Sequence, residues 1–87
     1  MKEPKISDYR LLNSGYECNS DDRSLDQRQS LSECADACRQ IKECNYFIFG
    51  NGIKTGKCYW EMTEDGKCSE GWENDHYDFY EMLSTFI

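Results

Sequence analysis

The chain has 87 residues, 38% of them hydrophobic, and its 10 Lys and Arg against 17 Asp and Glu give a formal net charge of −7 at pH 7. A single domain of this size buries little apolar surface, so we expect covalent cross-links to add to its stability. The negative charge argues against nucleic acid, heparin or an anionic membrane surface as a partner. No apolar run reaches the roughly 18 residues of a membrane span, and 14% aromatic residues are too many for a disordered acidic tail.

The six cysteines can provide these cross-links. An even number of cysteines in so short a chain is typical of disulfides formed in an oxidising compartment, such as the secretory pathway, the cell surface or the plastid lumen. The first residues contain no apolar segment with a cleavage site, so we expect that a signal peptide was removed or lies outside this sequence. The sequence contains no Asn-x-Ser/Thr sequon, so N-glycosylation is not expected.

The predicted domain covers residues 8–82, between a polar leader over 1–7 and an apolar tail over 83–87. A first strand is expected over Tyr9–Leu12, because this apolar stretch ends at a Gly-containing turn. Residues 18–28 are polar and show no periodicity, so a loop is predicted there. Its acidic residues could bind a cation, but a solvated loop is the simpler interpretation.

The clearest helix begins after Ser30. Ser30 and Glu33 fit a capping box, in which each side chain accepts a hydrogen bond from a backbone N–H at the helix start. Apolar residues then recur at spacings of three and four up to about Lys42, which places Cys34 and Cys38 on one buried face. We expect this face to pack against a sheet.

Three strands are predicted after the helix. The apolar run Tyr46–Phe49 is typical of a central strand that is covered on both faces. Residues Lys57–Met62 alternate in character and indicate a second strand. A loop over 67–75 and a last strand over His76–Met82 follow.

Geometry limits the fifteen pairings that six cysteines allow. Cys34 and Cys38 point the same way from the helix, so they should bond to different partners. Cys44, just beyond the helix, can fold back to Cys38, and Cys58 on a neighbouring strand can reach Cys34. Cys18 and Cys68 remain as the third pair.

The spacing Cys34-x3-Cys38-x5-Cys44, the aromatic strand Tyr46–Phe49 and the segment Cys58-Tyr59-Trp60 resemble the PAN/Apple domain family over about residues 9–82. The resemblance implies an α+β fold, a small disulfide-rich domain with one α-helix packed on a curved antiparallel β-sheet. It also implies nested disulfides, first to sixth, second to fifth and third to fourth. One feature departs from the family, because Apple domains keep the outer pair near the two ends whereas Cys68 is followed by nineteen residues.

Catalytic and metal-binding interpretations have little support in the sequence. The one histidine, His76, lies on a predicted strand, and a disulfide framework leaves no free thiol, so no enzyme and no catalytic residue are predicted. A zinc site from Cys34, Cys38, Cys44 and Cys58 lacks the two close cysteine pairs that are typical of structural zinc. EF-hand spacing is absent, so no metal and no cofactor are expected among the acidic residues Asp65, Glu70, Glu73, Asp75 and Asp78.

The aromatic residues carry a more specific prediction. Strand alternation turns Cys58, Trp60 and Met62 towards the helix, so Tyr59 points away from it. An aromatic patch on that far face would suit sugar-ring stacking or a protein hot spot. The predicted ligand-binding residues are Tyr59, Tyr80, Tyr46, Glu61 and Asp78. The alternative is that the 67–75 loop folds over this face, with Trp72 as its lid.

The sequence therefore predicts a noncatalytic module of the PAN/Apple type, extracellular or on the cell surface, that recognises a protein or a glycan as part of a longer chain. The alternative is a small disulfide-stapled structural subunit of a larger assembly, held by its edges and its apolar tail. The plastid lumen would also suit that alternative.

Overall fold

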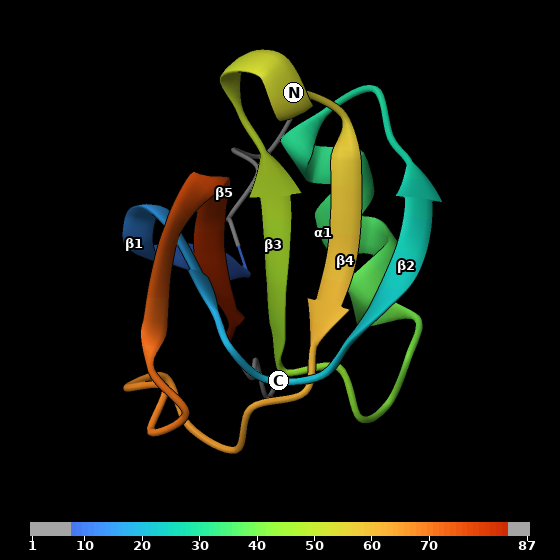
Figure 1. The fold of residues 1–87 in the computed structure, drawn as a ribbon. Helices are drawn as coiled ribbons and strands as arrows, with labels where there is room; N and C mark the ends of the chain where they lie inside the picture. Colours follow the sequence, from blue (N-terminus) through green and yellow to red (C-terminus); the bar gives the residue numbers. More distant parts are fainter. Residues whose placement is uncertain (1–7, 84–87) are drawn as a thin grey trace.

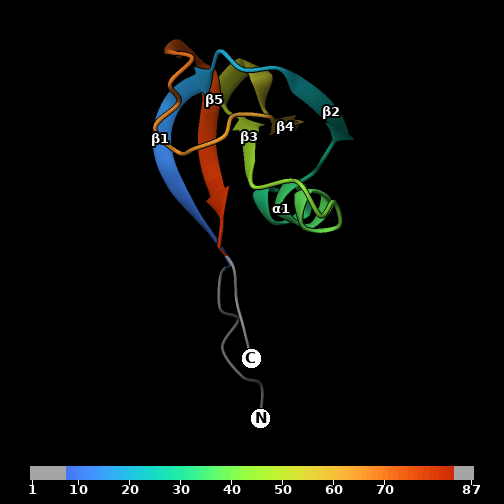
Figure 2. The same ribbon diagram turned by 90° about the horizontal axis from the view of Figure 1, so that it is seen from below.

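The computed structural model describes residues 8–83, so the predicted leader and all but the first residue of the tail lie outside the described residues. One α-helix packs on a five-stranded antiparallel sheet with the order β1-β5-β3-β4-β2 (Figure 1). Figure 2 shows the curvature of this sheet and the single helix beside it. The predicted α+β class is confirmed. The elements are β1 (Tyr9–Cys18), β2 (Asp22–Gln27), α1 (Leu31–Arg39), β3 (Tyr46–Gly50), the 3-10 helix η1 (Gly52–Lys54), β4 (Lys57–Glu61) and β5 (Trp72–Met82).

Helix α1 begins where the capping box predicts. The backbone N–H of Glu33 donates to Ser30 Oγ at 3.2 Å, and the Glu33 carboxylate accepts from the backbone N–H of Gln29 at 3.2 Å. The helix ends at Arg39 rather than near Lys42, because the chain turns there. Within the described residues, no helix has the length and apolar character needed to cross a membrane.

Three disulfides hold the elements together. Cys34–Cys58 joins α1 to β4, Cys38–Cys44 closes the turn after α1, and Cys18–Cys68 joins the end of β1 to the loop before β5. Their Cα–Cα distances are 5.7, 5.4 and 5.8 Å, within the usual range for disulfides. These are the pairs that the sequence analysis favours. Cys34–Cys58 thus links the helix directly to the sheet.

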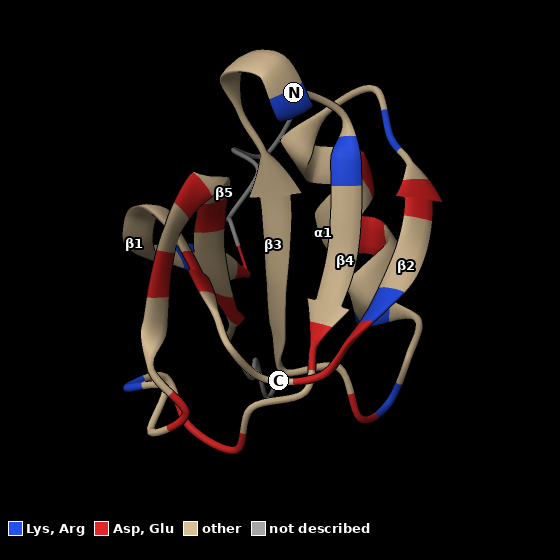
Figure 3. Ribbon diagram, in the orientation of Figure 1, with Lys and Arg blue, Asp and Glu red and all other residues tan. Residues whose placement is uncertain are grey.

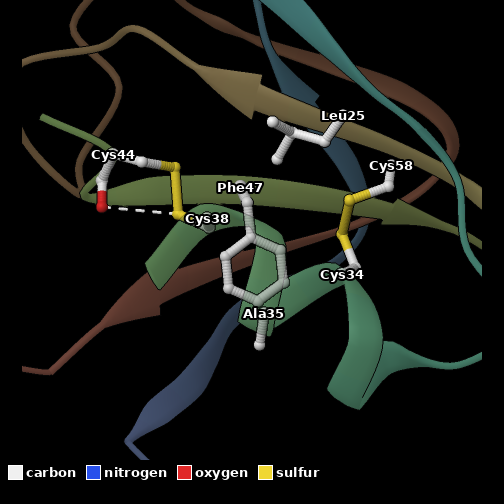
Figure 4. Close-up of a cluster of buried hydrophobic side chains, with 7 residues drawn as sticks. All are labelled: Leu25, Cys34, Ala35, Cys38, Cys44, Phe47 and Cys58. Atoms are coloured by element: carbon white, nitrogen blue, oxygen red, sulfur yellow. Dashed lines mark hydrogen bonds between the residues drawn. A yellow bond between two sulfur atoms is a disulfide. The ribbon is translucent and has the colours of Figure 1, made fainter. Parts of the chain in front are cut away.

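Both faces of the sheet are buried. On the helix face, the Phe47 ring lies between the two disulfides of α1 (Figure 4), in a cluster of Leu25, Cys34, Ala35, Cys38, Cys44, Phe47 and Cys58. On the opposite face, a second cluster contains Cys18, Tyr46, Ile48, Cys68, Tyr77 and Phe79. Strand β3 contributes to both clusters and lies at the centre of the sheet, as predicted.

Two strands differ from the sequence prediction. Strand β1 does not end at the turn expected after Leu12 but continues to Cys18, with register shifts on either side of residues 13 and 14 and with Gly15 at φ 83°. Residues predicted as a loop form the edge strand β2, in which Leu25 is the only buried side chain. Charged side chains on an edge strand discourage pairing with other chains, and they also hide the strand from pattern analysis.

The predictions for the last two strands, β4 and β5, differ less from the structure. Met62 was predicted to face the helix, but β4 ends at Glu61, and Met62 is 38% exposed and is not part of the helix-face cluster. Strand β5 begins at Trp72 instead of His76, so part of the predicted 67–75 loop is strand.

Candidate functional site

The five residues of the predicted aromatic patch do not form one surface. Tyr46 and Tyr59 share the face opposite the helix, but Tyr46 is buried and Tyr59 is half-buried. Tyr80 lies on the helix face, where its ring stacks on Phe47 with centroids 5.1 Å apart. The prediction that Tyr80 joins Tyr59 is therefore corrected.

The far face of the sheet is covered by the chain itself. The Trp72 ring packs edge-on against Phe79 with centroids 4.9 Å apart. Gly66 in the loop before β5 approaches so closely that an added Cβ would lie 2.8 Å from Leu12 and 3.5 Å from Tyr46. Trp72 thus packs on this face as the alternative expected, but it does so from strand β5 and not from a loop.

Asp78, predicted as a polar rim residue, joins three segments of the fold. Its Oδ1 accepts hydrogen bonds from Ser14 Oγ at 3.0 Å, from the Gly15 N–H at 2.9 Å and from Asn51 Nδ2 at 2.9 Å. The carboxylate thus fixes the irregular part of β1 against β5 and the segment that follows β3. This arrangement indicates a structural role.

Glu61, the other predicted rim residue, is buried with 1% of its surface exposed. Its Oε2 accepts a hydrogen bond from the Cys18 N–H at 3.0 Å, and its Oε1 has no hydrogen-bond partner among the described residues. Burial, with the negative charges of Asp22, Glu17 and Glu70 adding to it, raises the pKa of Glu61 to about 8. The side chain is therefore largely protonated at neutral pH and is not available to an external ligand.

Acidic residues are numerous on β5 and in the loop before it (Figure 3), and Glu17 of β1 lies opposite Glu73 of β5. The carboxylates of Glu17, Glu73 and Asp75 lie within 4.8 Å of one another. The Lys54 ammonium makes an ion pair with Asp75 and lies 4.8 Å from the centre of the Tyr77 ring. Hydrogen bonding to Lys54 lowers the pKa of Asp75 to about 2, whereas burial raises that of Glu17 to about 7. Lys54 thus supplies a positive charge at this cluster.

A second group of possible metal ligands consists of Cys18, Cys68 and Glu70. Its two sulfur atoms form a disulfide, so neither is a thiolate that could bind a metal. The same holds for the four cysteines of the zinc site considered from the sequence, because all of them are in disulfides.

A hollow with a volume of about 490 Å³ lies between α1 and β2. We call it the α1–β2 groove. Strand β2, which borders it, is an edge strand that pairs only with β4, and that pairing shifts register between Ser24 and Gln27. Asp26 within this bulge has a φ of 68°. The groove is lined by Ser24, Leu25, Asp26, Arg28, Glu33, Asp36, Ala37, Gln40 and Ile41.

The groove combines an apolar base with a polar rim. Leu25 is buried, and Ala37 and Ile41 are half-buried, whereas Asp26, Glu33 and Asp36 are exposed. A smaller hollow of about 100 Å³ lies on the other side of the bulge and reaches Tyr59. Tyr59, one of the predicted ligand-binding residues, thus borders this smaller hollow. None of the residues that line the α1–β2 groove was predicted as a ligand-binding residue, and for those on α1 the exposed face of the capped helix was the available signal.

Comparison with known proteins gives one match. A family model described as the PAN domain matches residues 5–84. Searches of curated proteins and of solved structures find no match.

Proposed function

Because the chain belongs to the PAN domain family, whose members are generally noncatalytic binding modules, we propose that it is an extracellular recognition module whose protein or carbohydrate ligand binds in the α1–β2 groove. The groove itself is the observation that carries this proposal. Its volume of about 490 Å³ is within the range of roughly 300–1,000 Å³ that is usual for ligand sites.

The disulfides support this placement. Cys34–Cys58 and Cys38–Cys44 hold α1, which forms one wall of the groove. A wall that is already fixed loses little conformational entropy when a ligand binds, so more of the contact energy contributes to affinity. Three disulfides also suit an oxidising, extracellular environment.

The proposal is tested by filling the groove. Ala37 lies on α1 and faces the groove, so Ala37→Trp would occupy part of its volume. Ile53→Trp is the matched control, because Ile53 is 84% exposed on η1 and does not line the groove. Wild type and both variants would be screened against a glycan array and a panel of displayed extracellular proteins. We expect ligands that bind wild type and Ile53→Trp but not Ala37→Trp. Ligands retained equally by both variants would place the site elsewhere.

The structural-subunit alternative has one observation in its favour. Four large apolar side chains are exposed among the described residues, namely Leu11, Ile53, Met62 and Leu83. Analytical ultracentrifugation distinguishes the two functions, because a recognition module should be a stable monomer. Self-association or aggregation of the isolated chain would favour the subunit.

A further inference from the structure

The chemistry of the α1–β2 groove narrows the class of ligand. Its base is formed by the aliphatic side chains of Leu25, Ala37 and Ile41, and its lining contains no aromatic residue. Carbohydrate sites usually offer an aromatic ring to the apolar face of a sugar. The groove therefore favours a protein ligand over a glycan.

The rim of the groove is predominantly acidic. It carries the carboxylates of Asp26, Glu33 and Asp36 against one guanidinium, that of Arg28. Arg28 already donates from its Nε to the Leu25 carbonyl oxygen at 2.7 Å, so part of its hydrogen-bonding capacity is used inside the fold. A groove lined mainly by one sign of charge attracts ligands of the opposite sign.

The acidic side chains also differ in how far they are already neutralised. Asp36 shares Arg39 with Asp8, and Glu33 accepts one backbone hydrogen bond. The Asp26 carboxylate makes no hydrogen bond or ion pair with any residue that the structure describes. Its side chain is held on the bulge of β2, at the border of both hollows.

A groove with an aliphatic floor and carboxylates at its rim is complementary to one kind of side chain. Lysine and arginine each have an apolar stem that packs on apolar surface and a cationic end that remains at the polar rim. We propose that the α1–β2 groove binds a basic segment of a partner protein, with a lysine or arginine stem over Ala37 and Ile41 and its charge at Asp26 and Glu33. This inference rests on the proposed function, because it takes the groove to be the ligand site.

The test uses a defined probe. An octapeptide of alternating serine and arginine would be titrated into the ¹⁵N-labelled protein at low ionic strength and followed by NMR. The same octapeptide with citrulline in place of arginine is the uncharged control. We expect the amide signals of Ala37 and Ile41 to shift, and the citrulline peptide to bind roughly tenfold more weakly.

Two double variants with the same net charge separate groove binding from general attraction to an acidic protein. Asp26→Asn with Glu33→Gln removes two groove charges, keeps a side chain suited to φ 68° and preserves the capping box. Glu64→Gln with Glu73→Gln removes two exposed charges that do not line the groove. The groove variant should bind the arginine peptide about three- to tenfold more weakly than wild type, and the control variant should stay within about twofold.

Two results would overturn the inference. One is an equal loss of affinity in both double variants, which would mean that binding follows net charge. The other is absence of binding of the arginine peptide to wild type. If Ala37→Trp nevertheless abolishes binding of a screened ligand, the groove remains the ligand site and only the basic partner is wrong. If Ala37→Trp affects neither that ligand nor the peptide, the proposed site itself is wrong.

Discussion

Replacement of Glu61 by glutamine is expected to stabilise the domain at neutral and alkaline pH. Glu61 is 1% exposed, and its pKa rises from an ordinary value of 4.5 to about 8, chiefly because of burial. The folded chain therefore binds a proton that the unfolded chain releases between these two values. The resulting stabilisation is complete below about pH 4.5 and is lost as the pH rises through about 8.

The size of this pH-dependent change in stability follows from the pH range between the two pKa values, 4.5 and about 8. Each pH unit inside it lowers the free energy of unfolding by about 1.36 kcal/mol, which gives an upper limit of roughly 3 kcal/mol at pH 7. Glutamine has the shape of the protonated acid and cannot ionise. Because its amide still needs a hydrogen-bond partner, we expect a net gain of about 2 kcal/mol at pH 7, or roughly 10 °C in Tm, and little change at pH 5.

Thermal unfolding followed by circular dichroism between pH 5 and pH 8 measures this difference with the disulfides intact. Glu64→Gln is the control, because Glu64 is exposed and should not alter the pH dependence. Part of the pH dependence should persist in Glu61→Gln, since Glu17 also has a raised pKa, about 7. A Glu61→Gln protein that is less stable than wild type at pH 8, or a difference that does not change with pH, would refute the reasoning.

Two further predictions concern the core. Loss of Cys34–Cys58, which closes 24 residues, should lower the free energy of unfolding by about 1 kcal/mol more than loss of Cys38–Cys44, which closes 6, as measured by urea unfolding of the double alanine variants. The opposite order of midpoints would contradict the entropic account. Trp60 packs against the helix-face cluster, so Trp60→Ala should cost roughly 2–4 kcal/mol in the same assay and Trp60→Phe clearly less; equal costs would show that the ring is not packed.

Sequence analysis succeeded where short-range patterns determine the structure. The capping box at Ser30 acts within one helical turn, and the apolar run of β3 needs no knowledge of its partners. The edge strands β1 and β2 were shortened or missed because their pairing partners, β5 and β4, lie far away in the sequence. A polar edge strand and a polar loop have the same composition, and only long-range hydrogen bonds distinguish them.

The sequence analysis placed Tyr80 on the wrong face of the sheet. Alternation within a strand is a local property, and it correctly separates Tyr80 from Phe79. Which face of the sheet Tyr80 and Phe79 each occupy depends on the register between β5 and β3. This register pairs Tyr80 with Phe47 and Phe79 with Ile48. Glu61 shows the same limit, since the backbone N–H that donates to its buried carboxylate belongs to Cys18, 43 residues away in the chain.

The position of the groove follows from where the disulfides attach. Cys34–Cys58 ties α1 to β4, while no disulfide reaches β2, so the helix is fixed to the sheet one strand short of the edge. Space between α1 and β2 can then open where the register shifts. Asp36 and Gln40, which line the groove on the exposed face of α1, belong to neither buried cluster, so they can change with little effect on the packing of the core. Ligand preference at this groove can therefore vary between proteins of this fold at little cost in stability.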